Sequence, residues 1–118
     1  MRMTYHLVPL ETWHAAEPDQ AYAAPSLETE GCIHCTDGAD AVIATAERYY
    51  RDDPRPYVAL AIDLDATGSP WRRDDPGSPF PHIYGPIARA AILAVLGVVR
   101  APDGRFIRLA GDRGDVPS

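Results

Sequence analysis

Three short segments of this sequence each place a histidine among alternating residues, the pattern of a half-buried β-strand. The segments are residues 4–8, 31–36 and 80–86, and they carry His6, His34 and His82. Successive side chains of a strand point to opposite faces, so each histidine lies opposite apolar neighbours that would face a core. Imidazoles titrate near neutral pH and can bind a polar ligand or transfer protons. If the three strands share one sheet, the histidines could converge on one cleft.

The third segment adds a phenol to the same face. In the sequence Phe-Pro-His-Ile-Tyr-Gly-Pro, Tyr84 lies two residues after His82, and Ile83 between them points the other way. Tyr84 could stack on a ring of the ligand or donate its hydroxyl. The fourth histidine, His14, belongs to a predicted helix and is interpreted as a surface residue.

The two cysteines flank the second segment, as Cys32-Ile-His-Cys35. Residues i and i+3 of a strand face opposite sides, so we predict two free thiols here. A zinc site would need a second Cys/His pair, and haem attachment would need a histidine at position 36, where Thr36 stands. The pattern therefore favours neither a metal motif nor a redox motif.

Length and composition indicate one globular domain, with a core over about residues 3–109 and a polar tail at 110–118. The chain has 118 residues, of which 46% are hydrophobic and 24% are charged, an ordinary globular balance. The net charge of −6 argues against nonspecific binding to nucleic acid or to acidic membranes. A small nucleotide in a local pocket is still compatible with this charge. All basic residues are arginines, which excludes Schiff-base chemistry on lysine.

The apolar runs of the sequence are short. The longest, residues 90–99, is too short to span a bilayer, and residues 1–10 do not resemble a signal peptide. We therefore expect a cytoplasmic protein with no membrane partner. The sequence leaves the oligomeric state open.

The elements that must position the histidines are short strands and a few helices. Strands are predicted at residues 3–8, 32–34, 57–63, 91–100 and 105–109, and helices at 10–16, 26–31 and from 36 or 37 to about 50. Ser26 is predicted to cap its helical turn and Gly31 to end it in a left-handed conformation. Residues 64–79 are predicted to form a long loop. The fold class is α+β, because the strands alternate too irregularly with helices for a doubly wound sheet.

Several of these residues resemble a known family in order and spacing. They are Tyr5-His6, Pro25-Ser26-Leu27, Glu30-Gly31-Cys32-Ile33-His34-Cys35 and the block from Phe80 to Pro86. Over about residues 3–98 the chain resembles the DUF952 family, small bacterial domains without an established activity. That family is similar in fold to the ADP-ribosyltransferase superfamily. The resemblance implies a small split antiparallel β-core around a cleft for NAD.

The resemblance also implies roles for the histidines, which fall at the strand positions that supply polar residues to such a cleft. His6 and His34 would bind a ribose hydroxyl or a phosphate, His34 could act as acid or base, and His82 would orient the ribose or the acceptor. The remaining ligand-binding candidates are Tyr84, Ser26, Thr36, Trp71 and Arg72. NAD is expected as a possible substrate and not as a permanently bound cofactor. ADP-ribosyl or phosphoryl transfer is the expected reaction. Arg72 and Arg73 could bind a phosphate.

Two other functions remain open on the residues alone. The transferases place a glutamate near the position of His82, and its absence there favours a noncatalytic domain that binds a ligand or a protein partner. Alternatively, three histidines from three strands could hold a catalytic zinc ion with water as fourth ligand. The spacing shows no His-x-His or Glu-x-x-His motif to support that metal hydrolase.

Overall fold

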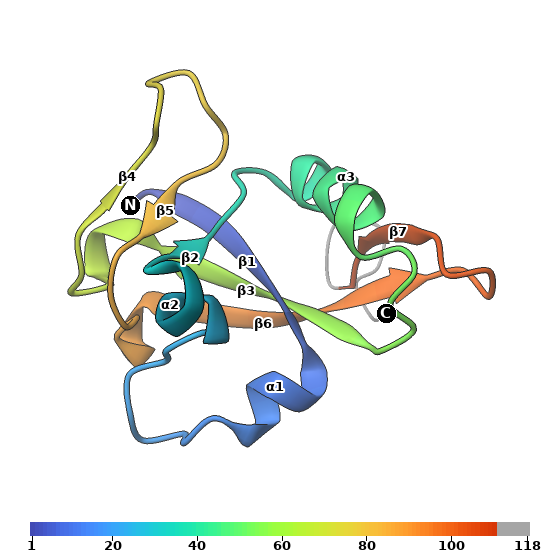
Figure 1. The fold of residues 1–118 in the computed structure, drawn as a ribbon, viewed down its shortest axis with the longest axis horizontal. Helices are drawn as coiled ribbons and strands as arrows, with labels where there is room; N and C mark the ends of the chain where they lie inside the picture. The colour runs from blue at the N-terminus through green and yellow to red at the C-terminus, as the bar shows by residue number, and fades with distance from the viewer. Residues whose placement is uncertain (111–118) are drawn as a thin grey trace.

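Two antiparallel sheets and a few helices make up the fold, seen in a computed structural model that describes residues 1–110 (Figure 1). The larger sheet has the order β1-β3-β6-β7, with β1 Met3–Pro9, β3 Tyr57–Asp63, β6 Ile92–Arg100 and β7 Phe106–Leu109. The smaller has the order β2-β5-β4, with β2 Ile33–His34, β5 His82–Ile83 and β4 Trp71–Arg72. The helices are α1 Leu10–Ala15, α2 Pro25–Glu30 and α3 Ala39–Tyr49, and two 3-10 turns span Leu64–Ala66 and Arg89–Ala91. The predicted α+β class is confirmed.

Strand β3 lies at the centre of the fold, as its continuous apolar sequence predicts. It pairs with β1 on one side and with β6 on the other, both antiparallel. Six of its seven residues are buried, because both faces of the larger sheet are covered. The predicted bounds of this strand, residues 57–63, are confirmed.

The two faces of the larger sheet pack against different partners. On one face Ala59 of β3 and Leu109 of β7 pack against Val42 of α3. On the other face Leu60 and Ile62 of β3 pack against a cluster that includes Ile33 and Ile83 of the smaller sheet. Figure 1 shows α2 and the smaller sheet gathered near the N-terminal end of β1, with α3 apart from them beside β7. The space between α3 and the smaller sheet is where the cleft described below opens.

The alternation along β1 decides which way His6 points. Thr4, His6 and Val8 are buried, whereas Tyr5 and Leu7 are only half-buried and pack toward α3. His6 pairs in register with Leu60, whose side chain belongs to the core beneath the smaller sheet. The predicted orientation of His6, opposite Tyr5 and Leu7, is confirmed.

The predicted start of α3, at residue 36 or 37, is wrong, because Thr36 and Asp37 make contacts with other elements. The helix begins after Gly38, which has a φ of 94° and offers no side-chain cap. Thr36 instead forms a bridge with β1, in which its N–H and carbonyl exchange hydrogen bonds with Tyr5 at 2.8 and 2.9 Å. The Asp37 carboxylate accepts a hydrogen bond from Arg73 at 2.6 Å. Both residues therefore connect the segment before α3 to other elements, and Gly38 is the residue that precedes the helix.

Two further local predictions are corrected by the structure. Helix α2 begins one residue before Ser26, whose hydroxyl donates to the carbonyl of Cys32 at 2.8 Å and so ties the helix to β2. The predicted loop 64–79 contains β4, which pairs with β5. A two-residue strand is too short to show any periodicity, so the sequence pattern misses it. Gly31 ends α2 with a φ of 80°, as predicted.

The two cysteines are free thiols on opposite sides of their segment. Cys32 lies beside His34, with its Sγ 3.9 Å from Nε2, and Cys35 belongs to the core with Ile33. Burial raises the pKa of both thiols, which keeps them protonated and weakly nucleophilic. Within residues 1–110, no helix has the length and apolar character needed to cross a bilayer. The predicted tail, 110–118, lies outside the described residues except for Ala110.

Candidate functional site

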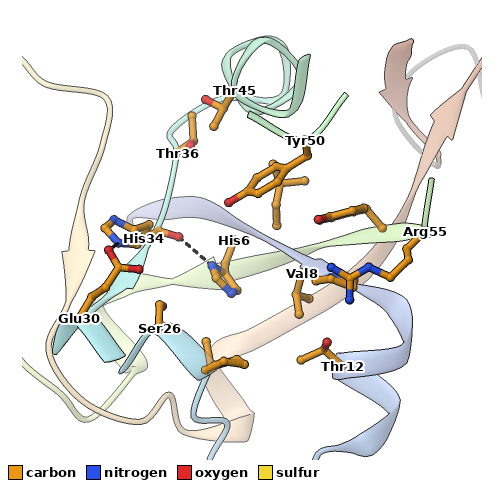
Figure 2. Close-up of a pocket in the computed structure, with 15 residues that line it drawn as sticks. His6, Val8, Thr12, Ser26, Glu30, His34, Thr36, Thr45, Tyr50 and Arg55 are labelled. Atoms are coloured by element: carbon orange, nitrogen blue, oxygen red, sulfur yellow. Dashed lines mark hydrogen bonds and ion pairs between the residues drawn. The ribbon is translucent and has the colours of Figure 1, made fainter. Parts of the chain in front are cut away.

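A cleft made of two adjoining hollows lies between α2, the smaller sheet and the C-terminal end of α3. The first hollow, which contains His6, has a volume of about 390 Å³, and the second, which contains His82, about 490 Å³. Both volumes are typical of small-molecule sites. The two hollows share five lining residues, namely Glu30, His34, Thr36, Thr45 and Tyr50. Figure 2 shows His6 with His34 to its left and Tyr50 above it.

His6 is the deepest polar group of the cleft, and its tautomer follows from its contacts. Its Nδ1 lies 2.7 Å from the carbonyl oxygen of His34, so Nδ1 carries the hydrogen and donates (Figure 2). Burial lowers the pKa of His6 to about 4, against the opposing effect of that hydrogen bond. The ring is therefore neutral at pH 7, and Nε2 is left with a lone pair that can accept a hydrogen bond.

Because its pKa is lowered, His6 makes the stability of the fold depend on pH. Below about pH 6.5 the unfolded chain takes up a proton at this ring, whereas the folded chain does so only near pH 4. This contribution to stability is complete above about pH 6.5 and is lost as the pH falls toward 4. Between about pH 7.5 and about pH 5.5 we expect a loss of roughly 1 kcal/mol from this residue.

Urea denaturation at the two pH values measures this effect. The matched variant is His6→Asn, whose amide N–H can still donate to the His34 carbonyl but does not titrate. We expect the variant to lose less stability on acidification than the wild type by roughly 1 kcal/mol. Equal losses in the two proteins would show that His6 has an ordinary pKa in the folded state.

His34 is held by a carboxylate that belongs to a different element. Its Nε2 lies 3.0 Å from Oε1 of Glu30, the last residue of α2, and donates to it. The left-handed turn at Gly31 reverses the chain between the helix and β2, which brings the two side chains together. Such a carboxylate fixes the orientation of an imidazole and leaves the other nitrogen, Nδ1, free to accept a proton or a hydrogen bond.

The structure brings the second and third predicted histidines together through strand pairing. His34 of β2 and His82 of β5 are direct partners, and directly paired residues share one face of a sheet. Their ring centroids are 5.1 Å apart in an edge-to-face arrangement. Nδ1 of His82 is buried and has no hydrogen-bond partner among the described residues. His6 and His82 do not line a common hollow, and His34 lies between them.

The charges of the cleft are mostly acidic. Glu30 lines both hollows, and Asp74 lines the second. Arg55 lines the first hollow, but it already contacts Asp53 at 2.7 Å and Glu11 at 2.8 Å. Burial raises the pKa of Tyr50, so its hydroxyl stays protonated and can donate to a ligand. The interior of the cleft thus suits neutral or cationic parts of a ligand better than free anions.

The other sequence-predicted candidates divide between two places. Ser26 and Thr36 line the first hollow. Trp71, Arg72 and Tyr84 line a separate shallow hollow of about 220 Å³ on the smaller sheet. Trp71 is half-buried and packs on the core, with the guanidinium groups of Arg2 and Arg73 over its ring. His14, the expected surface residue, is exposed on α1.

Several polar residues that line the cleft are not among the sequence-predicted candidates. They include Glu30, Thr45, Tyr50 and Asp74. Glu30 precedes His34 by four residues, a spacing that indicates a contact only within one helix, whereas here the pair crosses from α2 to β2. Tyr50 follows the end of α3, where the helical periodicity assigns it to the apolar face. The sequence pattern therefore could not have identified Glu30 or Tyr50 as site residues without the fold.

The described part of the chain shows no group of three His, Cys, Asp or Glu side chains placed to hold a metal ion. His6 explains part of this, because its Nδ1 is bonded to a backbone carbonyl and its ring lies deeper than those of His34 and His82. The arrangement is better suited to hydrogen bonding and proton transfer than to coordination.

Comparison with known proteins gives a family and a fold. Residues 7–95 match the family described as "Protein of unknown function (DUF952)". The crystal structure of the protein CC0527 from Caulobacter crescentus, and that of a double mutant of it, are similar with a TM-score of 0.69 and 21% identity. The similarity covers 89% of this chain and 93% of that one.

The solution NMR structure of CC0527 is similar with a TM-score of 0.63 and 21% identity, over 88% of this chain and 90% of that one. At this identity the likeness shows a shared fold. No curated protein matches the chain.

Proposed function

The chain belongs to the DUF952 family, and we propose that its cleft binds NAD or another ADP-ribosyl nucleotide, with the Glu30–His34 pair at the ribose. The observation that carries this proposal is the 3.0 Å contact between a carboxylate and an imidazole at the junction of two nucleotide-sized hollows. An ADP-ribosyltransferase-like fold is part of the same proposal. It is supported by an antiparallel β-core whose strands β1, β2 and β5 supply His6, His34 and His82.

The acidic interior fits the chemistry of the nicotinamide–ribose bond. The nicotinamide ring of NAD carries a positive charge, and cleavage of this bond develops an oxocarbenium-like centre on the ribose. A carboxylate such as Glu30 stabilises positive charge at that position. The ADP-ribosyltransferases place a glutamate near the position of His82. In this proposal Glu30 of α2 takes the role of that glutamate. Because His82 pairs with His34, Glu30 reaches the same region of the cleft.

The neighbouring groups complete a simple transfer reaction. His6, which stays neutral, accepts a hydrogen bond from a ribose hydroxyl through Nε2. The glycosidic bond breaks, and nicotinamide leaves with the bonding electron pair. A water molecule or an acceptor hydroxyl then bonds to the ribose carbon, and its proton passes to Nδ1 of His34. The pair of electrons, the charge and the proton are all accounted for without a metal ion.

Differential scanning fluorimetry with NAD, ADP-ribose and AMP tests the binding step. A ligand at a hundredfold excess over its dissociation constant stabilises the folded state by about 2.7 kcal/mol. In a domain of this size we expect the melting temperature to rise by about 5–10 °C. No shift with any of the three nucleotides at millimolar concentration would contradict the proposal.

A noncatalytic ligand-binding domain is the second candidate, and one observation favours it. The hydrogen bond from His6 to the His34 backbone satisfies a carbonyl next to the core, so this histidine also has a structural role. Incubation with NAD, followed by chromatography of the nucleotide, separates the two candidates. Slow release of nicotinamide supports transfer chemistry, and full recovery of intact NAD from a complex supports binding alone.

A further inference from the structure

The outer face of the smaller sheet carries a row of three basic side chains, one from each strand. His82 of the central strand β5 pairs directly with His34 of β2 on one side and with Arg72 of β4 on the other. Directly paired residues share a face, so the three side chains lie on the same side of the sheet. The neighbouring row, Ile33, Ile83 and Trp71, points the other way and packs in the core. We call His34, His82 and Arg72 the basic row.

Arg72 is the one residue of the basic row that carries a permanent positive charge, and its guanidinium has donors free for a ligand. Its guanidinium lies over the ring of Tyr84 at 5.2 Å, and its Nε donates to the Tyr84 hydroxyl at 3.4 Å. These contacts leave both Nη groups free to donate, and none of the ion pairs found within residues 1–110 involves Arg72. Arg73 differs, because Asp37 holds its Nη2 at 2.6 Å. The sequence presents two adjacent arginines, and the fold leaves only the first of them unpaired.

His82 adds a second polar ring to the basic row, and its side chain is half-buried. Its Nδ1 is buried and lacks a hydrogen-bond partner among the described residues, which is costly unless a ligand or water supplies one. Its ring lies between His34 and Arg72, by the pairing given above. A group with several acceptor oxygens placed over β5 could bind the guanidinium and the imidazole together.

We propose that the basic row is a phosphate subsite, which sets the direction in which a nucleotide lies across the cleft. This inference rests on the proposed function. The phosphate lies over Arg72 and His82, and the ribose extends past His34 to Glu30 and His6. Arg72 lies outside the two hollows, in strand register with His82, which lines the second hollow. Glu30 disfavours an anion at the junction of the hollows and Arg72 attracts one beyond the second hollow, which fixes the two ends of the ligand. Arg72, rather than the shape of the hollows, then selects phosphorylated ligands.

The carboxylate of Asp74 lies near the subsite and disfavours an anion there. Its removal should therefore strengthen phosphate binding, whereas removal of Arg72 should weaken it. Asp74 lines the same hollow as His82, and its carboxylate lies near enough to Arg72 to act on its charge. It weakens the attraction for an anion at the basic row. Replacement of Asp74 by asparagine is therefore expected to tighten the binding of a phosphorylated ligand severalfold and to leave an unphosphorylated one unchanged.

Isothermal titration calorimetry with three probes tests the proposal: ADP-ribose, inorganic pyrophosphate and nicotinamide riboside, which has no phosphate. Arg72→Gln removes the charge, and Arg105→Gln removes an equal charge from an exposed residue whose nearest carboxylate is Asp103 at 3.7 Å. We expect Arg72→Gln to weaken ADP-ribose and pyrophosphate binding about tenfold or more and nicotinamide riboside binding less than about twofold. Arg105→Gln is expected to change all three by less than about twofold.

The outcomes separate this inference from the function on which it rests. If ADP-ribose binds wild type and Arg72→Gln equally well, the basic row is not a phosphate subsite, although the nucleotide proposal stands. If only pyrophosphate binds, and does so through Arg72, the subsite stands and the nucleotide proposal falls. If none of the three probes binds wild type, both fall. Tighter ADP-ribose binding by Asp74→Asn supports the subsite, and weaker binding contradicts it.

Discussion

Replacing Arg100 with leucine is expected to lower the free energy of unfolding by about 2–4 kcal/mol, the largest effect on stability that we predict for a side chain outside the apolar core. The guanidinium of Arg100, at the end of β6, donates to four backbone carbonyls, at distances of 2.5 to 3.1 Å. These acceptors are the carbonyls of Arg51, Asp53, Arg55 and Gly104. The Cζ atom of Arg100 also lies 4.0 Å from the centre of the Phe106 ring.

The physical reason is that Arg100 joins two segments that have no regular structure of their own. Residues 51–56 link α3 to β3, and residues 101–105 form the turn between β6 and β7. Hydrogen bonds to a charged donor contribute about 1.5–3 kcal/mol each when buried, but these carbonyls are partly exposed and would regain water. The expected total is therefore well below the sum of the individual bonds.

Urea denaturation of three variants measures this contribution. Arg100→Lys keeps the charge but not the planar fork, so it should recover less than half of the lost stability. Arg105→Leu, in the same hairpin, removes an exposed arginine and should cost less than about 0.5 kcal/mol. If Arg100→Leu and Arg105→Leu have the same transition midpoint at equal slope, the carbonyl contacts contribute no net stability.

The sequence predicts the fold best where a segment has a period or a long apolar run. Residues 57–63 are apolar throughout and form the central strand, with both ends as predicted. The strands predicted at 91–100 and 105–109 form as β6 and β7, each starting one residue later than predicted, and the Ala-Pro-Asp-Gly sequence between them is typical of a turn. These segments are specified by their own residues, because their surroundings only need to be apolar.

The sequence fails where a segment is defined by a partner distant in the chain. Strand β4 has two residues and exists through its pairing with β5, eleven residues later. Gly38 rather than Asp37 precedes α3 because Arg73, which follows β4, takes the Asp37 carboxylate. Contacts of this kind depend on the whole fold and leave no local pattern to detect.

The candidate site shows the same division. Alternation indicates which face each histidine occupies, and the structure places His6, His34 and His82 on the expected faces. Alternation does not give the register of β2 against β5, which decides that His34 and His82 touch. It also gives no sign of Glu30, which reaches the site through the turn at Gly31. The sequence therefore predicts which histidines belong to the site. The tertiary structure determines which of them are neighbours and that Glu30 contacts His34.

Replacement of His34 by alanine is expected to remove the nucleotide-dependent rise in melting temperature, from about 5–10 °C to less than about 1 °C. His34 is the one histidine that lines both hollows, and its Nε2 is hydrogen-bonded to the Glu30 carboxylate. The unliganded variant should stay folded, because the side chain is 50% exposed. The bond that His34 makes to His6 uses its backbone carbonyl, which alanine retains.

His14→Ala is the matched control, since His14 is exposed on α1 and lines neither hollow. It should show the same nucleotide-dependent shift as the wild type. Because the His34 backbone still holds His6, the two variants should melt within about 2 °C of each other without ligand. A wild-type-sized shift in His34→Ala would mean that nucleotides bind away from this cleft. The acidic junction between the two hollows would then have to be explained by a different ligand, one that carries positive charge.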